Sequence, residues 1–589
     1  MLYSDVPEPQ PHERLRFLET PVLTKTESTS HESRDPASED RELDREIIKL
    51  RRYEEPTLLE VFFDLFFAAN YGVFTKTQSV NSSEGFNSTL GYFAMLWMTW
   101  LLIGLYDVRF VTDSIFERVA RAAQLGVMVG FAVVAPNFNP SQQIEQTMRT
   151  MSLILMVSRI VLAVEYTSIA WHLRRFKNSH VGMALQVSLN LVSAIIYLGM
   201  SFGFRHGTSQ VFIGWYIVSA AEVLLTFALS NHWQFLGFTE THLMKRLTLL
   251  TVIILGDGIV SMCDKVVIIV KSPDAWDSLT IGIVTASTAI VYFTFLIYFD
   301  WIRELYLPPW RQQVWTLLHF PFHLALVLWN TAFVQFIMWA KIIDVMGKIR
   351  VPSIFEDATQ LAQSSSEELA TTLDDWIWGI FFRYPPKWAS TYDAATEAIY
   401  NISSLPDELW AQLAEYMTDE NATTDINQTA VLVFTDTLTT IEGVVRNAIF
   451  QSFDIDLMGE QNDENKGKQN VTVLSDAEIS DKSEQRYSLV FTYGYLAAGI
   501  ALALMTILAA ITRQRAWKAW PIIRTCINLF LSLSIGLVAI LYYFEDARMR
   551  FLGTPWLLPM ICLIQFVMLL ITHIRTERPP WLFKRATEW

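Results

Sequence analysis

Long hydrophobic stretches alternate with short polar segments along most of the chain. Twelve of them approach the ~20 apolar residues that a helix needs to cross a bilayer core. This pattern predicts an all-α fold, a polytopic transmembrane helical bundle of about 12 spans. The expected limits are 57–74, 89–107, 118–135, 147–170, 181–202, 211–229, 243–262, 279–301, 313–339, 488–511, 521–543 and 555–573.

Composition agrees with a membrane protein. Of the 589 residues, 52% are hydrophobic and only 18% are charged, against about 25% charged in soluble domains. The net charge of −15 argues against nucleic acid as a partner. The three cysteines form neither a disulfide framework nor a zinc-ligand spacing.

Basic residues concentrate in alternate loops, which places both chain termini in the cytosol. We expect a multi-pass protein of the plasma membrane or an endomembrane. The N-x-S/T sequons all fall in loops that this topology places outside, which makes them glycosylation candidates. They are Asn81, Asn87, Asn401, Asn421, Asn427 and Asn470.

The same pattern divides the chain into five parts. Residues 1–55 are polar, carry no visible cleavable signal peptide, and predict a disordered cytosolic tail. Residues 56–340 form a transmembrane core, 341–487 an outer domain, 488–574 the last three helices, and 575–589 a cytosolic tail.

The outer domain is strongly acidic. Residues 344–486 contain 26 acidic and nine basic residues, and their net charge of −17 exceeds that of the whole chain. Helical periodicity near 391–403, 406–417 and 429–452 predicts a small, mainly helical, acidic extracytosolic domain, which is a candidate to bind a protein partner. The alternative is a partly disordered acidic loop.

Ionisable residues inside the predicted membrane helices are the candidate site. Glu60 and Asp64 are four residues apart, so a helix places both on one face, and a charge in hydrocarbon costs at least ~2.5 kcal/mol. Asp257 lies eleven residues beyond Arg246, about 16 Å deeper along a helix, as at the floor of a cavity open to the cytosol. The substrate- or ion-binding candidates are Glu60, Asp64, Asp107, Arg109, Asp113, Arg118, His242, Arg246, Asp257, Asp300 and His319.

Each candidate also has a structural interpretation. Charges near helix ends, such as Asp107 and Asp300, can snorkel to the interface or pair across a loop. Glu60 can form an interhelical clamp with Arg246 or Arg118, and His319 can be a hydrogen-bonded core histidine. Asp257 is flanked by two glycines, where a ligand, an ion or a neighbouring helix can approach.

Five short motifs together resemble the low-temperature-requirement A (LtrA) family of membrane proteins over about residues 57–323. Glu60, Phe62, Phe63, Asp64 and Leu65 match its "ELFFDL" opening, and later residues resemble its "LGE", "YFD" and "HxP" motifs in order. Lys245 and Asp257 replace two family glutamates. The fit extends to Arg109, Phe110, Asp113, Arg118, His242, Arg246, Leu255, Gly256, Tyr298, Phe299, Asp300, His319 and Pro321. The sequons and length are typical of a eukaryotic relative, for instance a fungal one.

Three classes of function remain open. Buried carboxylates and histidines favour a transporter or an ion- or proton-handling protein, whose partners are the lipid bilayer and a small ion or proton. The second class is a lipid-binding protein or membrane enzyme. In a protein of this class, His319 and His323 could ligate a metal, although their spacing is generic. The third is a receptor-like or structural protein acting through the outer domain. No enzyme motif stands out, and the sequence assigns no cofactor or metal.

Overall fold

A computed structural model describes most of the chain. The described residues are 15–22, 50–78, 80, 82–110, 112–204, 209–239, 241–271, 276–302, 307–418, 427–456 and 476–574, without the side chains of 476, 477, 479 and 480. In these ranges every regular element is a helix, which confirms the predicted all-α class. A single antiparallel bridge joins Val22 and Leu50.

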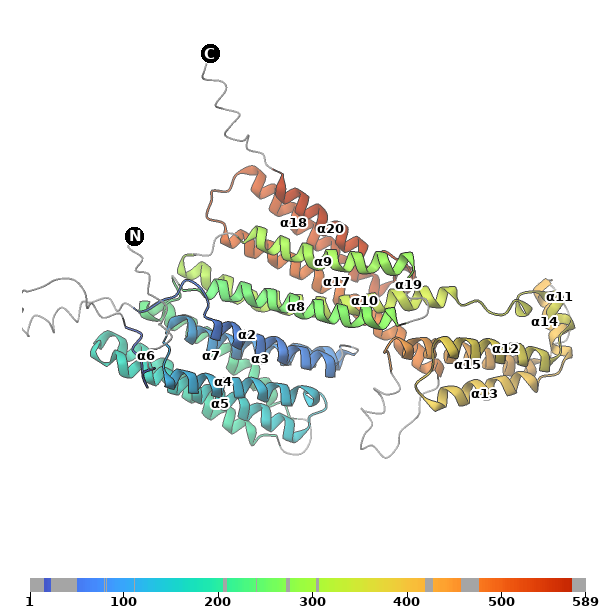
Figure 1. Ribbon diagram of the computed structural model, residues 1–589, viewed down its shortest axis with the longest axis horizontal. Coiled ribbons are helices and arrows are strands. Elements are labelled where there is room, and N and C mark those ends of the chain that lie inside the picture. The colour runs from blue at the N-terminus through green and yellow to red at the C-terminus, as the bar shows by residue number, and fades with distance from the viewer. Residues whose placement is uncertain are drawn as a thin grey trace, which may run out of the picture. The chain divides into compact units, whose positions relative to one another are not determined.

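Each of the twelve predicted spans coincides with a helix (Figure 1). These helices are α2 (Leu58–Thr77), α3 (Ser83–Arg109), α4 (Ile115–Val134), α5 (Glu145–His172), α6 (His180–Ser201), α7 (Phe212–His232), α8 (Leu243–Val270), α9 (Ser278–Trp301), α10 (Pro309–Lys348), α17 (Asp476–Thr512), α18 (Ala519–Leu537) and α20 (Pro559–His573).

Within the described ranges, ten helices are long and apolar enough to cross a membrane. The other two of the twelve are α8, which has 28 residues, and α20, a shorter apolar helix of 15 residues. Many apolar helices are the mark of a polytopic membrane bundle, as the hydrophobic pattern predicts.

The described chain divides into two compact units. The first comprises residues 1–257, 298–327 and 500–532, and the second comprises 258–297, 328–499 and 533–589. In the first unit α3 is the most buried span, and it packs against α2, α5 and α7. Gly91 leaves room for a side chain of α7, since a Cβ at this position would lie 2.1 Å from the Tyr216 hydroxyl oxygen.

Short parts of the N-terminal segment are held by contacts in the first unit. The carbonyls of Arg16 and Phe17 accept the free backbone N–H groups of Ile115 and Phe116 at the start of α4, at 3.1 and 3.2 Å. These bonds satisfy donors that the first turn of a helix leaves unpaired. Residues 1–14 and 23–49, most of the expected tail, lie outside the described residues, as do residues 575–589.

The second unit contains the acidic segment as a set of packed helices. They are α11 (Ala358–Gln363), α12 (Ser366–Arg383), α13 (Ala389–Ser403), α14 (Glu408–Thr418) and α15 (Gln428–Ser452). The chain packs α12, α13 and α15 together (Figure 1), around a hydrophobic cluster that includes Leu369, Ile402 and Trp410. The three helices expected from periodicity in this segment are therefore present.

An ion-pair cluster joins α9 to α10 in the second unit. The Asp277 carboxylate accepts hydrogen bonds from Lys341 Nζ at 3.0 Å, Lys348 Nζ at 2.5 Å and the backbone N–H of Thr280 at 2.7 Å. Burial acts to raise the pKa of the Asp277 carboxyl, but hydrogen bonds, those of Lys348 and Thr280 among them, hold it well below its usual range.

Candidate functional site

The first turn of α2 fixes the position of Glu60. Thr57 and Glu60 form a capping box, in which the Thr57 backbone N–H donates to Glu60 Oε2 at 2.7 Å. The second carboxylate oxygen of Glu60 stays available for a partner on another helix. Asp64 follows one turn later and is fully buried, so both acids face the interior of the unit, as the i,i+4 spacing predicts.

Arg246 of α8 lies between carboxylates from two other helices. Its Nη2 donates to Asp64 Oδ1 at 2.9 Å and its Nη1 donates to Asp107 Oδ2 of α3 at 2.8 Å. Glu60 Oε1 is 3.6 Å from the same Nη1. The Arg246 side chain has no exposed surface, which means that these ion pairs are shielded from water.

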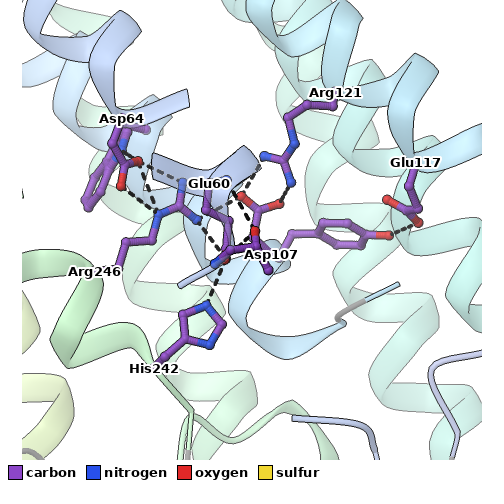
Figure 2. A network of polar contacts seen from close by, with 10 residues as sticks. Glu60, Asp64, Asp107, Glu117, Arg121, His242 and Arg246 are labelled. Carbon is purple, nitrogen blue, oxygen red and sulfur yellow. Dashed lines mark hydrogen bonds and ion pairs between the residues drawn. The ribbon is translucent and has the colours of Figure 1, made fainter. Parts of the chain in front are cut away.

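Three further residues complete this cluster: Arg121, Trp100 and His242, which contacts Glu60. Arg121 of α4 binds both oxygens of Asp107, with 2.6 Å from its Nη1 to Oδ2, and the Trp100 indole N–H donates to Asp64 Oδ1 at 2.7 Å. Figure 2 shows the carboxylates and guanidinium groups pointing toward one another. We name this set the Arg246 network: Glu60, Asp64, Trp100, Asp107, Arg121, His242 and Arg246.

His242, just before α8, bonds to oxygen through both ring nitrogens. Its Nε2 is 2.9 Å from Glu60 Oε1 and its Nδ1 is 3.1 Å from the backbone carbonyl oxygen of Tyr53. A carbonyl oxygen only accepts hydrogen bonds, so Nδ1 must donate. The Nε2 contact then needs a second proton, held either by His242 or by Glu60.

Arg109 lies apart from the ion pairs of the network. It is 1% exposed, its Nη1 donates to the Tyr166 hydroxyl at 3.0 Å, and its guanidinium carbon lies 4.3 Å from the ring centroid of Phe238. Its Nε and Nη2 have no hydrogen-bond partner in the described structure. Arg109 is thus held by aromatic groups, and it is neither snorkelling nor paired across a loop.

Two predicted candidates pair with each other at the surface instead. Both guanidinium contacts of Arg118 with Asp113 are 2.8 Å, and the two side chains are 54% and 46% exposed. The structure therefore selects Arg246 over Arg118 as the partner of Glu60. Asp300, near the end of α9, is half-buried and has contacts of its own.

Asp257 lies against α2. A Cβ at Gly72 would stand 3.0 Å from Asp257 Oδ1, and the charge of Lys76, one turn along α2, acts on this carboxylate. The glycine that follows has a different role, because a Cβ at Gly258 would stand 2.7 Å from the Asn330 amide nitrogen. The Asn330 side chain of α10 thus fills the space beside Gly258.

The two histidines of α10 have defined hydrogen bonds. His319 Nδ1 donates to the Trp315 carbonyl oxygen at 2.8 Å, so its Nε2 accepts from the Tyr298 hydroxyl at 3.0 Å. His323 Nδ1 accepts from the Trp97 indole at 3.1 Å, so its Nε2 donates to Thr251 Oγ1 at 2.9 Å. Both rings are satisfied as neutral tautomers. In the described part of the chain no group of three or more His, Cys, Asp or Glu residues could hold a metal.

A second buried ion pair was not predicted. Arg159 of α5 binds Glu222 of α7 at 2.8 Å and donates to Thr99 of α3 at 3.0 Å. Tyr197 of α6 donates to the same Glu222 carboxylate at 3.2 Å. Polar residues inside these apolar helices are the sequence signal for this pair, but nothing in their spacing indicates which partners meet.

Arg121 was also missed. It lies three residues after Arg118 on α4, and only the helix register decides which of the two faces the interior. Lys245, which stands where the resemblance expects a glutamate, pairs with Glu55 outside the network.

Three of the predicted glycosylation sites are described. Asn87 and Asn427 are exposed, and Asn401 is partly exposed. Asn81, Asn421 and Asn470 lie outside the described residues. Glycosylation itself stays a prediction.

Comparison with known proteins gives one match. The family model described as "Bacterial low temperature requirement A protein (LtrA)" matches residues 56–343, which contain the whole Arg246 network. No curated protein and no solved structure matches the chain.

Proposed function

We propose that this chain, which belongs to the LtrA family of membrane proteins, moves protons or a small cation across its membrane. The Arg246 network would be the ion-binding part of the pathway. The observation that carries the proposal is the contact of both His242 ring nitrogens with oxygen atoms, from which we infer a second proton shared with Glu60.

Charge balance gives this proton its importance. The network contains three carboxylates, from Glu60, Asp64 and Asp107, but only two guanidinium groups. With one proton shared between His242 and Glu60, the network is neutral. Without it, a net negative charge stays buried, which is costly in a membrane protein. A proton, or a small cation in its place, restores neutrality.

The connections of the network also suit a site that changes state. Arg246 reaches two helices through separate nitrogen atoms, with Asp64 on α2 and Asp107 on α3. When Glu60 becomes negative, its contact with Arg246, now 3.6 Å long, can strengthen, and when Glu60 is protonated the contact can weaken. The other bonds of Arg246 hold the helices in both states. Such a redistribution would couple proton binding to helix packing.

A second candidate rests on the same contacts. Every charged side chain of the network has a partner within hydrogen-bond distance, so the network can act as a permanent clamp that joins α2, α3, α4 and α8. The protein would then act through the helices α11–α15, as a receptor-like or structural protein. Flux and stability measurements separate the two candidates.

The first experiment measures proton and cation flux in proteoliposomes with a lumenal pH-sensitive dye and imposed H⁺, Na⁺ or K⁺ gradients. It compares wild type with Asp64→Asn and His242→Gln, which keep side-chain size and hydrogen bonding close to native. The control is Asp113→Asn, which removes the same charge from the exposed Arg118 pair.

We expect wild type and Asp113→Asn to carry flux and both network variants to lose it while still folding. Flux that is unchanged in folded Asp64→Asn and His242→Gln would contradict the proposal. Absence of flux in wild type under every gradient, together with large losses of stability in the network variants, would favour the clamp.

Asp257 extends the same test deeper along α8. Its carboxylate lies against Gly72, and Asp257→Asn should leave folding intact but abolish pH- or ion-dependent flux. Flux like that of wild type in this variant would show that Asp257 is not part of the pathway. The proposed role of the Arg246 network would be unaffected.

A further inference from the structure

A second feature lies among the helices of the acidic segment. A cavity of about 630 Å³ opens between the end of α10 and helices α12, α14 and α15. This volume lies in the range of small-molecule sites, which are mostly apolar and have few polar groups. The lining is apolar here too, with Ile349, Phe355, Leu373, Trp376, Leu413 and Phe434 among its residues.

The wall of the cavity is firmly built. Leu373 and Ile441 belong to the hydrophobic core of these helices and are 2% and 4% exposed. The Trp376 indole N–H donates to the backbone carbonyl oxygen of Arg350 at 2.8 Å, which fixes the ring in the wall. The cavity is therefore formed by side chains whose positions the domain core determines.

Part of the rim of the cavity is apolar and exposed. Val351, Met417 and Leu438 line it and are 51%, 50% and 39% exposed. They stand in a segment whose net charge is −17. An apolar body that enters the cavity would remove these side chains from water, and this transfer drives binding.

The charged residues of the lining form one pair. Glu442 and Arg446 are one turn apart on α15 and make an ion pair with each other. Together they offer both an acceptor and donors, which suits a hydroxyl group. An anionic head group would meet the negative charge of the surrounding segment and is disfavoured.

We propose that this cavity binds an uncharged lipid, whose apolar body fills the cavity while its hydroxyl head lies beside Glu442 and Arg446. Sterols and monoacylglycerols share this chemistry. The site is separate from the Arg246 network, and its occupant is defined by apolar volume and a neutral polar head.

The experiment titrates the purified full-length chain, in detergent, with radiolabelled cholesterol, monooleoylglycerol or oleic acid. We expect saturable, equimolar binding of one or both uncharged probes, and at least about tenfold weaker binding of oleate, a difference of ~1.4 kcal/mol. Whichever uncharged probe binds more tightly identifies the lipid class. Oleate binding as tight as theirs would overturn the assigned head group, and no saturable binding of any probe would overturn the site.

A matched pair of variants tests the location. Leu438→Trp places a large ring at the rim, and Leu432→Trp makes the same change on the outer face of α15, where the side chain is 71% exposed. Both positions are exposed enough to accept tryptophan without disturbing the core. We expect the rim variant to bind at least about tenfold more weakly and the control to bind like wild type. Equal affinity in the two variants would place the lipid elsewhere.

Discussion

Arg246 is a fully buried side chain that faces three carboxylates. Its contacts with Asp64 and Asp107 are 2.9 and 2.8 Å long, and all three carboxylates are buried. Loss of one partner from a buried ionic cluster is therefore costlier than loss of an exposed pair.

Arg246→Met should lower the free energy of unfolding by roughly 3–5 kcal/mol, because it leaves buried carboxylates unpaired. Arg118→Met is the matched control and should cost no more than about 1 kcal/mol, since its partner Asp113 is exposed. Denaturant unfolding of both variants in detergent measures the difference. Similar losses would show that the network contributes no more than a surface pair.

The sequence predicts part of this site. The i,i+4 spacing places Glu60 and Asp64 on one face, and both contact Arg246 in the structure. The choice of Arg246 over Arg118 is not in the pattern, because both arginines lie near membrane helix ends and the pairing depends on packing between helices 182 residues apart in the chain.

Among the helices, the Arg159–Glu222 pair shows how buried polar contacts organise four spans. It links α5 to α7 directly, α3 through Thr99 and α6 through Tyr197. Packing of α3 against α5 and α7, and of α6 against α5 and α7, accompanies these bonds. The pair fixes the rotation of each helix about its own axis, because only one face carries the polar residue.

A double-mutant cycle tests this role. Glu222→Met alone should destabilise the protein by about 3–5 kcal/mol, because it leaves a buried guanidinium unpaired, whereas adding Arg159→Met should recover most of the loss. Unfolding free energies of the two single variants and the double variant give the coupling. Additive losses would mean that the two side chains act independently.

The hydrophobic pattern predicts which part of a helix lies in the bilayer, but it does not predict where the helix begins and ends. The predicted span 313–339 became α10 (Pro309–Lys348), and 488–511 became α17 (Asp476–Thr512). Apolar periodicity marks where a helix is immersed, while its ends depend on caps and breakers such as Pro352, which follows α10 closely. The predicted span 243–262 likewise lengthened at its C-terminal end, since α8 continues to Val270.

For the whole molecule, orientation stays a prediction from loop charge and sequons. The helices α11–α15 are expected on the outer side, with both termini in the cytosol. Asn427 offers a direct test because it has two roles. It begins a sequon, and its side-chain oxygen accepts backbone hydrogen bonds from Thr429 and Ala430 as the N-cap of α15.

Asn427→Asp keeps an N-cap acceptor but removes the glycan acceptor, whereas Asn427→Ala removes both. After expression in eukaryotic cells, both variants should lose one glycosidase-sensitive mass step on a gel. Only Asn427→Ala should also lower stability, by about 1 kcal/mol, because the cap is lost. A wild-type protein without any glycosidase-sensitive shift would argue against the outer placement of these helices.

The Arg246 network also has a consequence for how the chain is made. Asp64 and Arg246 are 182 residues apart, and at ~5–20 residues per second their synthesis is separated by roughly 10–40 s. During that interval, α2 has left the ribosome with two acids and without its counter-ion. The nascent helix must wait beside the insertion machinery or in the polar interface until α8 arrives. We therefore expect completion of this ion pair to be a checkpoint in biogenesis that comes before the second half of the chain is made. Most chains of an Arg246 variant should then be degraded while they are still immature.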